Sequence, residues 1–319
     1  MPSNIHMAPT ILIIGATGNT GKSVLRHLPK LLEGNKTDYR ILGLTRSVDS
    51  DVSKTLSKLP RVEMEEKDWT EIDEQWLRSR DVVRVYIAPH NLPHQFVEES
   101  GLYVALLNAG VKYVVKISTN TLYVGPTNPV YYGRAHWAIE TMLSQPEFKA
   151  MQWTSLQPNF FTASYLASAA NWIKEYRKTG KQGEFSTTLA EDAAVAMIDP
   201  EDVGNVGAHL LALEDTTPHN QAKYVLSGPE DVTGRGIVQL VEKVTGVKVE
   251  KAVFKDVTWQ EDLVKAGYSE KVLKSIMAGN IPLWEEKCTL AGTPTSKKIL
   301  ELAPPQRTCE AALRAMLET

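Results

Sequence analysis

Three glycines, at positions 15, 18 and 21, follow the apolar run Thr10–Ile14 and give the clearest chemical signal in the sequence. Gly15 allows a tight turn out of a strand, Gly18 lets the backbone approach a pyrophosphate, and Gly21 lets a helix pack closely on the sheet. The free amides and the dipole at the start of that helix attract phosphate. The spacing predicts a dinucleotide-binding turn; the alternative is a glycine-rich turn without a ligand. The small polar residues expected beside the phosphates are Thr17, Asn19 and Thr20.

The end of the next expected strand, residues 39–45, discriminates between the two nicotinamide cofactors. An acid there accepts hydrogen bonds from the ribose hydroxyls of NAD, whereas a base binds the 2′-phosphate of NADP. Arg46 occupies this place, Ser47 follows it, and no acid appears before Asp49. A guanidinium holds phosphate through forked, charge-assisted hydrogen bonds. We therefore expect NADP(H) bound by Arg46 and Ser47; the alternative is that Arg46 is a solvated surface residue.

Four further residues are assigned to the cofactor from the expected topology. Asp68 follows the third strand, and Ala88 and Pro89 follow the fourth, which are the places where adenine and pyrophosphate rest in such a fold. Lys116 lies inside the fifth strand. Its ammonium either reaches the cofactor or extends outward to solvent.

A parallel sheet is needed to bring these residues together. Strand-like runs alternate with amphipathic stretches, which predicts parallel pairing through right-handed crossovers. We expect an α/β fold with a Rossmann-type, doubly wound parallel sheet in residues 1–158 and a smaller α/β substrate lobe in residues 159–319, interwoven with the sheet. The expected strands are 10–14, 39–45, 62–66, 82–88, 113–118, 153–157 and 224–226, and the expected helices lie near 50–58, 71–79, 94–109, 132–145 and 160–178.

With these residues placed, the chain resembles the NmrA-like branch of the atypical short-chain dehydrogenase/reductase superfamily. The resemblance implies a dinucleotide-binding domain with a C-terminal substrate lobe, and it implies that Pro158, Asn159 and Phe160 border the nicotinamide. The family includes NAD(P)H-dependent reductases, some of them in plant and fungal secondary metabolism, and regulators that sense redox state through protein partners. Besides the glycine turn, the segments that carry the resemblance are 110–118, 133–140, 153–161, 198–203, 224–229 and the closing Pro304-Pro305.

The catalytic residues are less sharply marked. Short-chain reductases use Tyr-x-x-x-Lys on one helix face and a serine after the fifth strand. Here Tyr132 is followed four residues later by His136, and the place where family members with a lysine keep it holds Glu140. We take His136, Tyr132 and Ser118 as the catalytic candidates. The alternatives are a structural helix histidine, a packing aromatic and a turn serine.

Hydride transfer needs alignment with the cofactor and exclusion of water more than it needs a strong acid. An activated double bond or an iminium can take its proton from solvent. We expect Phe161 and Tyr165 to bind an apolar substrate beside the nicotinamide. The leading hypothesis is an NADPH-dependent reductase of a small ketone, enone, imine or quinone. The alternatives are a non-catalytic NADP(H)-sensing regulator that acts through a protein partner, and an inert scaffold with a vestigial turn.

Composition excludes several other classes. The 319 residues include 35 Lys and Arg and 38 Asp and Glu, which gives a net charge of −3. The chain therefore lacks the excess of basic residues that is typical of nucleic-acid-binding proteins. No apolar run reaches the ~18 residues of a membrane helix. Two cysteines, Cys288 and Cys309, make no disulfide framework and indicate a reducing compartment. Residues 1–7 lack the pattern of a secretory signal. We expect a cytoplasmic protein, either monomer or homodimer, without nucleic-acid or membrane partners.

Metal binding is not expected. His90 and His94 are four residues apart, but Pro93 between them disfavours a helix and no third ligand stands near in the sequence. Asp199 and Asp202 flank Pro200 and are expected to cap a helix.

Overall fold

The computed structural model describes residues 8–318, so the residues on which the expectation about a secretory signal rests lie outside it. Its central sheet is formed by β1 (Thr10–Ile14), β2 (Arg40–Thr45), β3 (Val62–Glu66), β4 (Val82–Ile87), β5 (Tyr113–Ile117), β6 (Gln152–Pro158) and β8 (Ala222–Leu226).

The strand order in this sheet is β3-β2-β1-β4-β5-β6-β8. All pairs from β3 across to β6 are parallel. The chain therefore runs outward from β1 to β3 and returns to β4, which makes the carboxyl ends of β1 and β4 the switch point where such sheets bind ligands. The expected doubly wound α/β fold is confirmed.

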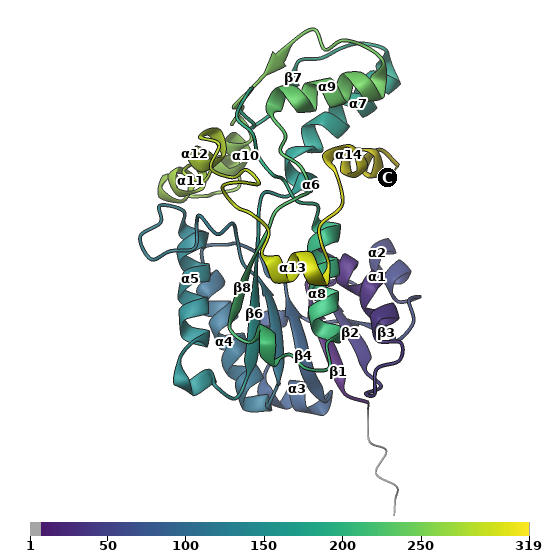
Figure 1. Cartoon of the computed structure of the whole chain (residues 1–319), viewed down its shortest axis with the longest axis vertical. Coiled ribbons are helices and arrows are strands. Elements are labelled where there is room, and N and C mark those ends of the chain that lie inside the picture. The colour runs from purple at the N-terminus through teal and green to yellow at the C-terminus, as the bar shows by residue number, and fades with distance from the viewer. Residues whose placement is uncertain (1–7, 319) are drawn as a thin grey trace, which may run out of the picture. The chain divides into compact units, whose positions relative to one another are not determined.

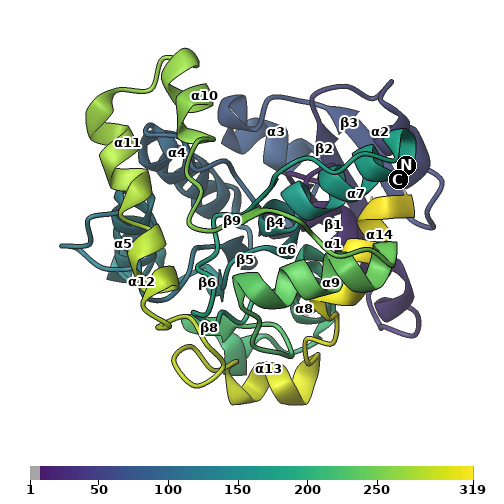
Figure 2. The same ribbon diagram turned by 90° about the horizontal axis from the view of Figure 1, so that it is seen from above.

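Helices cover both faces of the sheet (Figures 1 and 2). One face is packed by α3 (Glu74–Ser79), α4 (Gln95–Ala109) and α5 (Tyr131–Leu143), and the other by α1 (Gly21–Leu31) and α8 (Pro200–Ala212). Because both faces are covered, every residue of β1 is fully buried, as its unbroken apolar sequence predicts. The core beneath α4 and α5 is a cluster that includes Leu12, Val85, Leu102, Leu106 and Ile139.

Two expected helices begin later than the sequence indicated. The helix expected near 71–79 is a 3₁₀ turn, Trp69–Glu71, followed by α3, because the carboxylate of Asp73 caps α3 by accepting from the amide of Trp76 at 2.7 Å. The single helix expected near 160–178 is two, α6 (Thr162–Tyr165) and α7 (Ala167–Thr179). It cannot begin at residue 160 because Phe161 forms a bridge with Ile198.

The chain divides into two compact units, each made of separated stretches. The first contains the chain up to Ser118, then Ala135–Leu156 and Val203–Tyr224; the second contains Thr119–Arg134, Gln157–Asp202 and Val225–Thr319. The expected division after residue 158 treats each part as continuous, whereas the chain crosses between the units several times. That domain boundary stays a prediction.

The returning stretch 203–224 is tied into the first unit at the end of α8. Arg84 on β4 donates from Nη1 to the carbonyl oxygens of Leu211 and Leu213, at 2.5 and 2.6 Å. Asn35 donates to the carbonyl of Ala212 at 2.9 Å. These bonds satisfy carbonyls that the helix end would otherwise leave without partners, and the guanidinium also complements the helix dipole.

The second unit is mainly helical. Its core includes Leu166, Ile173, Phe185, Ile237 and Leu313. A short parallel pair joins β7 (Phe185–Ser186) to β9 (Ala252–Val253). The helices after α7 are α9 (Gly234–Thr245), α10 (Gln260–Lys265), α11 (Glu270–Met277), α12 (Asn280–Trp284), α13 (Lys297–Leu302) and α14 (Cys309–Glu318).

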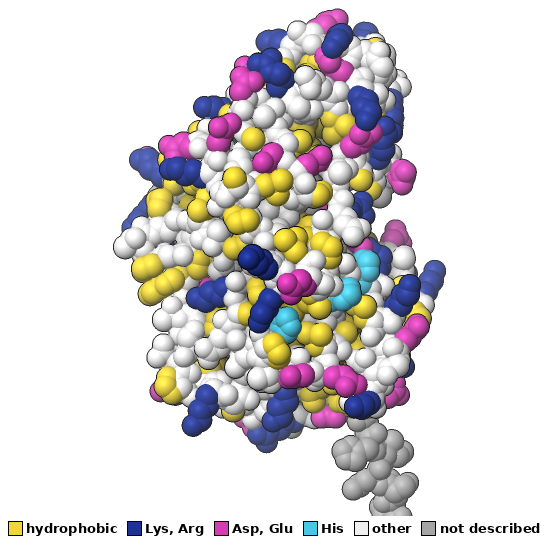
Figure 3. Space-filling model, viewed as in Figure 1, with side chains coloured by type: hydrophobic (Ala, Val, Ile, Leu, Met, Phe, Trp, Pro, Cys, Tyr) yellow, Lys and Arg dark blue, Asp and Glu magenta, His cyan; other side chains and the backbone are white. Residues whose placement is uncertain are grey.

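The surface of residues 8–318 shows no large region of a single charge on the face that Figure 3 draws, in keeping with the nearly balanced composition. Basic and acidic side chains are interspersed over the face shown in Figure 3. Among residues 8–318, no helix combines the length and the apolar character that a membrane crossing requires.

Candidate functional site

The glycine turn lies where the sheet topology requires it, directly after β1. Gly15 has a φ of +80°, and a methyl group on it would lie 2.6 Å from the carbonyl oxygen of Ala88 after β4. A methyl group on Gly21 would clash with the carbonyl oxygen of Gly15. The turn is closed by the amide of Gly18, which donates to the carbonyl of Gly15 at 2.9 Å. Only glycine fits at positions 15 and 21. The first helix therefore begins close to the carboxyl ends of β1 and β4.

The start of α1 is electrostatically open to an anion. Its first turn contains no acidic residue, and the side chain of Thr20 does not cap the helix. The dipole of α1 is therefore not neutralised by the chain itself, which favours an anionic ligand at this end. Gly18 and Asn19 are exposed, and Thr17 is half-buried beside them. This geometry can hold a pyrophosphate.

Arg46 follows β2 directly and is exposed. Within residues 8–318, no acidic side chain pairs with its guanidinium. Ser47 beside it is held by Thr45, whose hydroxyl donates to the Ser47 carbonyl at 3.0 Å. A free guanidinium on an ordered turn is available to bind a phosphate.

Of the cofactor-binding residues expected after the third and fourth strands, Ala88 and Pro89 lie beside the glycine turn, whereas Asp68 has a structural role of its own. Ala88 and Pro89 are half-buried beside the glycine turn, since the Ala88 amide donates to the carbonyl of Ile14 at 3.2 Å. Asp68 is exposed, and its carboxylate accepts from the amide and the hydroxyl of Thr70 at 2.9 and 2.8 Å. Those two hydrogen bonds lower the pKa of Asp68. One of its oxygens is therefore engaged in capping, and its role at adenine stays a prediction.

Lys116 is fully buried, so the alternative in which its side chain extends to solvent is wrong. Its Nζ lies 3.1 Å from Nδ1 of His136 and 3.7 Å from Oε1 of Glu99. Glu99 is also fully buried and accepts from Gln95 at 2.9 Å and from the Tyr103 hydroxyl at 3.1 Å. The fifth strand and α4 thus place a paired cation and anion beneath the carboxyl edge of the sheet. Paired and hydrogen-bonded charges are the form in which a protein interior tolerates them.

His136 is fixed by donors and acceptors on both ring nitrogens. A lysine ammonium can only donate, so the contact with Lys116 makes Nδ1 the acceptor and leaves the ring proton on Nε2, which faces Oδ1 of Asn91 at 3.2 Å. Burial and the Lys116 charge hold the pKa of His136 well below 6.5. The ring is therefore neutral at physiological pH. It can orient neighbouring groups through its single N–H, but it lacks the second proton of an imidazolium and so does not act as a general acid.

Ser118 donates its hydroxyl proton to Glu140 at 2.8 Å, and Ser155 donates to the same oxygen at 2.7 Å. Burial alone would raise the pKa of Glu140, but the Lys116 charge and these hydroxyls outweigh it and lower that pKa. Lys223 reaches the other carboxylate oxygen at 3.1 Å and is itself 43% exposed. Glu140, at the place of the family lysine, thus accepts the hydrogen bond that the Ser118 hydroxyl would otherwise donate to a substrate carbonyl.

The buried histidine should make the free energy of unfolding depend on pH. The unfolded chain takes up a proton at His136 below about pH 6.5, whereas the folded chain does so only at much lower pH. The stabilising contribution is therefore complete above pH 6.5 and declines as pH falls through it, by about 1.4 kcal/mol per pH unit. Denaturant unfolding at pH 7.5 and 5.5 should show a smaller decline for His136→Gln than for the parent chain. The control His219→Gln should keep the parent's decline; an equal decline in all three proteins would contradict a buried neutral ring.

In the second unit, the structure gathers several predicted residues into one aromatic cluster. Tyr132 meets Tyr123 edge to face at 6.2 Å between ring centres, Tyr123 meets Phe160 at 6.2 Å, and Phe160 meets Tyr165 at 5.1 Å. Burial raises the pKa of Tyr132 to about 12. This is the opposite of the shift that a Tyr-x-x-x-Lys pair produces. Phe161 is half-buried and bridges to Ile198.

Asn159 is buried at the end of β6, and its side chain is fully engaged within the second unit. Its Nδ2 donates to the carbonyl of Cys288 at 2.9 Å and contacts Thr293 at 3.1 Å, while its Oδ1 accepts from Asn120 at 2.8 Å. Pro158 before it is buried. The side chain of Asn159 therefore anchors this segment, and the contact of residues 158–160 with the nicotinamide stays a prediction.

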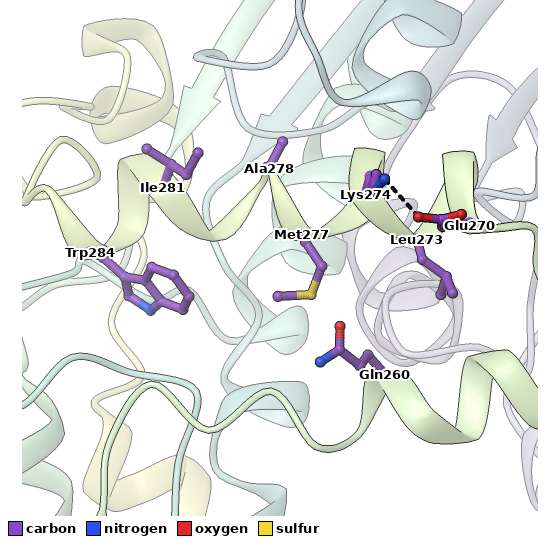
Figure 4. A pocket seen from close by; sticks show the side chains of 8 residues that line it. All are labelled: Gln260, Glu270, Leu273, Lys274, Met277, Ala278, Ile281 and Trp284. Atoms are coloured by element: carbon purple, nitrogen blue, oxygen red, sulfur yellow. Dashed lines mark ion pairs between the residues drawn. The ribbon is translucent and has the colours of Figure 1, made fainter.

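A cavity of about 530 Å³ lies against α10, α11 and α12. Leu273, Met277, Ile281 and Trp284 give it an apolar lining, and the ion pair between Lys274 and Glu270, 2.7 Å long, lies at one end (Figure 4). Its volume suits a small organic molecule. The expected substrate-binding residues Phe161 and Tyr165 do not line this cavity.

Several residues of the site were missed from the sequence. Gln95 and Glu99 on α4, Asn91 before it and Lys223 on β8 all join the Lys116–His136–Glu140 cluster. A signal existed for Glu99, because an acid one turn before the buried Leu102 and Tyr103 lies on the apolar face of a helix. The free state of Cys288 and Cys309 agrees with the absence of a disulfide framework, and burial raises the pKa of both thiols to about 12.

The expectation that His90 and His94 have no third potential ligand near them is wrong, because Glu98 lies beside both rings. The helix α4 begins at Gln95, immediately after His94, and its first turn places the Glu98 carboxylate next to both imidazole rings. Pro93 precedes the helix and does not interrupt it. Asp199 caps α8, as expected, by accepting from the amide of Glu201 at 2.8 Å. The same expectation is wrong for Asp202, whose Oδ2 instead accepts from the amides of Gln306 and Arg307 at 3.0 and 2.9 Å.

Solved structures of known proteins share this fold over nearly the whole chain. An NADPH-dependent quinone oxidoreductase from Escherichia coli, solved with NADPH, is 19% identical with a TM-score of 0.70, and the match covers 96% of this chain and 99% of that one. The triphenylmethane reductase of Citrobacter sp., solved with NADP(H), is 20% identical with a TM-score of 0.67, covering 97% and 100%. NmrA, a negative transcriptional regulator solved with NAD, is 13% identical with a TM-score of 0.69, covering 98% and 96%.

At these identities the structural likeness shows the fold alone. No curated protein matches the sequence itself. The match to a protein-family model is more specific, because it runs from residue 7 to residue 280 and so includes the glycine turn, the buried cluster and the aromatic cluster. The resemblance noted from the sequence is thereby confirmed, and the chain belongs to the NmrA-like family.

Proposed function

We propose that the protein is an NADPH-dependent reductase that acts on a small apolar or conjugated substrate: a ketone, enone, imine or quinone. The observation that carries the proposal is the glycine turn, whose tight approach to Ala88 and uncapped helix start suit a pyrophosphate. The exposed Arg46, without an acidic partner in residues 8–318, suits the 2′-phosphate that distinguishes NADPH from NADH. Bound NADPH would supply the hydride.

In this proposal the buried cluster positions groups and does not donate protons. Lys116 fixes the ring of His136, and Glu140 fixes the hydroxyl of Ser118, through the hydrogen bonds described above. The substrate's proton comes from solvent, which suits an activated double bond or an imine better than an unactivated ketone. Phe161 and Tyr165 bind the apolar part of the substrate. For an unactivated ketone, which needs a donor from the protein, Tyr132 is the remaining candidate.

The proposal is tested by turnover and binding together. NADPH oxidation is followed at 340 nm with a panel of quinones, triphenylmethane dyes, enones, imines and aldehydes, and NADPH and NADH affinities are measured by calorimetry. Substrate-dependent oxidation of NADPH supports the reductase. No heat of binding with either nucleotide would overturn it.

Gly18→Ala gives the sharpest control for the nucleotide site. The added methyl group lies 3.0 Å from the carbonyl oxygen of Gly15, on the exposed side of the turn, where it obstructs the pyrophosphate. A methyl group where the backbone must approach the pyrophosphate should weaken NADPH binding by roughly tenfold to hundredfold, which is about 1.4–2.8 kcal/mol of binding free energy. Because this contact with a backbone oxygen is tight, the melting temperature without nucleotide should fall somewhat, and affinity is therefore measured at a temperature where circular dichroism shows the variant to be folded. Unaltered affinity would show that phosphate does not bind at this turn.

A second candidate function is an NADP(H)-sensing regulator that acts through a protein partner. It is favoured by the state of the catalytic candidates: His136 is neutral and buried, and the Ser118 hydroxyl donates its hydrogen bond to Glu140. Micromolar or tighter NADPH binding without turnover on any member of the panel would favour the regulator. Turnover that is lost in Tyr132→Phe would favour the enzyme.

A further inference from the structure

We propose that His90, His94 and Glu98 form a binding site for a divalent metal ion of the zinc class. One suitable atom from each side chain lies within 4.8 Å of the other two. Nε2 of His90 is 3.0 Å from Oε2 of Glu98, and Nε2 of His94 is 3.4 Å from Oε1. Ligands on one zinc ion, each about 2.0–2.2 Å from it, are separated by distances of this order.

The local structure holds the three side chains on one side of the loop between β4 and α4. His94 is the residue before the first turn of α4, and Glu98 lies one turn further along, so the two share a helix face. The ring of His90 lies edge-on to that of His94, with 5.2 Å between ring centres, and packs against Trp69 at 5.8 Å. This packing limits the rotation of His90 and keeps its Nε2 near the carboxylate.

A second observation points to a ligand at this place. Oε2 of Glu98 is buried and accepts no hydrogen bond from any residue in the described part of the chain, although Nε2 of His90 is close. A carboxylate oxygen that is shielded from water and lacks a donor is costly. A cation between the carboxylate and the two rings removes that cost.

The donor set specifies the class of ion. Two imidazole nitrogens and one carboxylate suit zinc and its transition-metal neighbours, whereas calcium and magnesium prefer oxygen ligands alone. Three protein ligands leave a coordination position for water or for another small molecule. The side chains are 33% (His90), 53% (His94) and 25% (Glu98) exposed, so an ion reaches them from solvent.

Binding requires one local rearrangement. Nδ1 of His90 accepts from the amide of Leu92 at 3.2 Å, and coordination through Nε2 moves the ring proton onto Nδ1. The chain therefore gives up one long hydrogen bond and gains three metal–ligand bonds. Asn91 in the same loop contacts His136, so the ion would also stiffen the loop that holds this ring.

The test uses the full-length protein, freed of metal with a chelator, and titrates it with Zn²⁺ and Co²⁺ at pH 7.5. We expect one ion per chain, and for Co²⁺ the intense visible absorption of a four-coordinate site. His94→Ala and Glu98→Gln should each weaken binding at least tenfold. His219→Ala removes a histidine elsewhere and should bind as the parent does.

Three outcomes overturn the proposal: no saturable binding by the parent chain, binding that the two ligand variants leave intact, or an equal loss in the His219 control. His94 is 53% and Glu98 25% exposed, so neither substitution removes a core side chain. Circular dichroism and the melting temperature check that both variants are folded. The site depends only on the loop and α4, so metal binding that persists in Gly18→Ala separates it from the nucleotide site.

Discussion

Replacing Lys116 with methionine is expected to lower the free energy of unfolding by about 3–5 kcal/mol, because removal of one partner from a buried ion pair leaves the other charge uncompensated. Glu99 is fully buried beside Lys116, and the same ammonium holds Nδ1 of His136. Methionine fills much of the space of the lysine stem but supplies no charge and no donor. Urea unfolding followed by circular dichroism measures the loss.

Two further variants show whether charge is the cause. In Lys116→Met with Glu99→Gln, the uncompensated carboxylate is also removed, and part of the lost stability should return. Lys274→Met removes an ion pair with Glu270 whose side chains are 76% and 81% exposed, and should cost about 0.5 kcal/mol or less. A loss in Lys116→Met as small as in Lys274→Met would show that the buried cluster is not held together by charge.

Arg46→Ala is expected to weaken NADPH binding by about tenfold to hundredfold, since a hydrogen bond to a charged group contributes about 1.5–3 kcal/mol. NADH affinity should stay within about twofold, because NADH lacks the 2′-phosphate. Arg46 makes no ion pair within residues 8–318, so its removal should leave the fold intact. Calorimetric titration with both nucleotides gives the ratio directly.

Lys58→Ala is the matched control for charge. Lys58 is an exposed lysine just after α2 (Asp51–Leu56), and its loss changes the net charge by the same amount. It should weaken NADPH only slightly through long-range electrostatics, and that slight effect should vanish at high salt. Equal losses for NADPH and NADH in Arg46→Ala would show that Arg46 does not read the 2′-phosphate.

The inner strands of the sheet were predictable because they are buried on both faces, whereas the edge strand β3, in which only Val62 is buried, was predictable from its place in the alternation of strands and helices. The runs Thr10–Ile14 and Val62–Glu66 have the predicted bounds, and the other strands shift by one or two residues. The errors fall where a distant residue decides the local structure. Ile198, thirty-seven residues after Phe161, holds Phe161 extended by a bridge, and no local pattern reveals that contact.

The candidate site was predictable wherever function depends on the backbone. The glycine turn requires residues without a side chain, and the glycines that meet this requirement can be identified directly in the sequence. The buried charges were not predictable in the same way. In the sequence, Lys116 cannot be distinguished from a lysine whose side chain reaches solvent. Only the structure shows that Glu99 and Glu140, from two different helices, compensate its charge. Pairing across elements is a property of the folded chain.

The return of the chain to the first unit at Val203–Tyr224 has a consequence for folding during synthesis. Domains usually mature as their own stretch of polypeptide emerges. Here the last turn of α8 is secured by Arg84 and Asn35, more than a hundred residues upstream. The first unit therefore stays incomplete until translation has passed Tyr224, and the longest stretch of the second unit, Val225–Thr319, is synthesised only after that point. No protease or truncation can release the first unit as one continuous fragment.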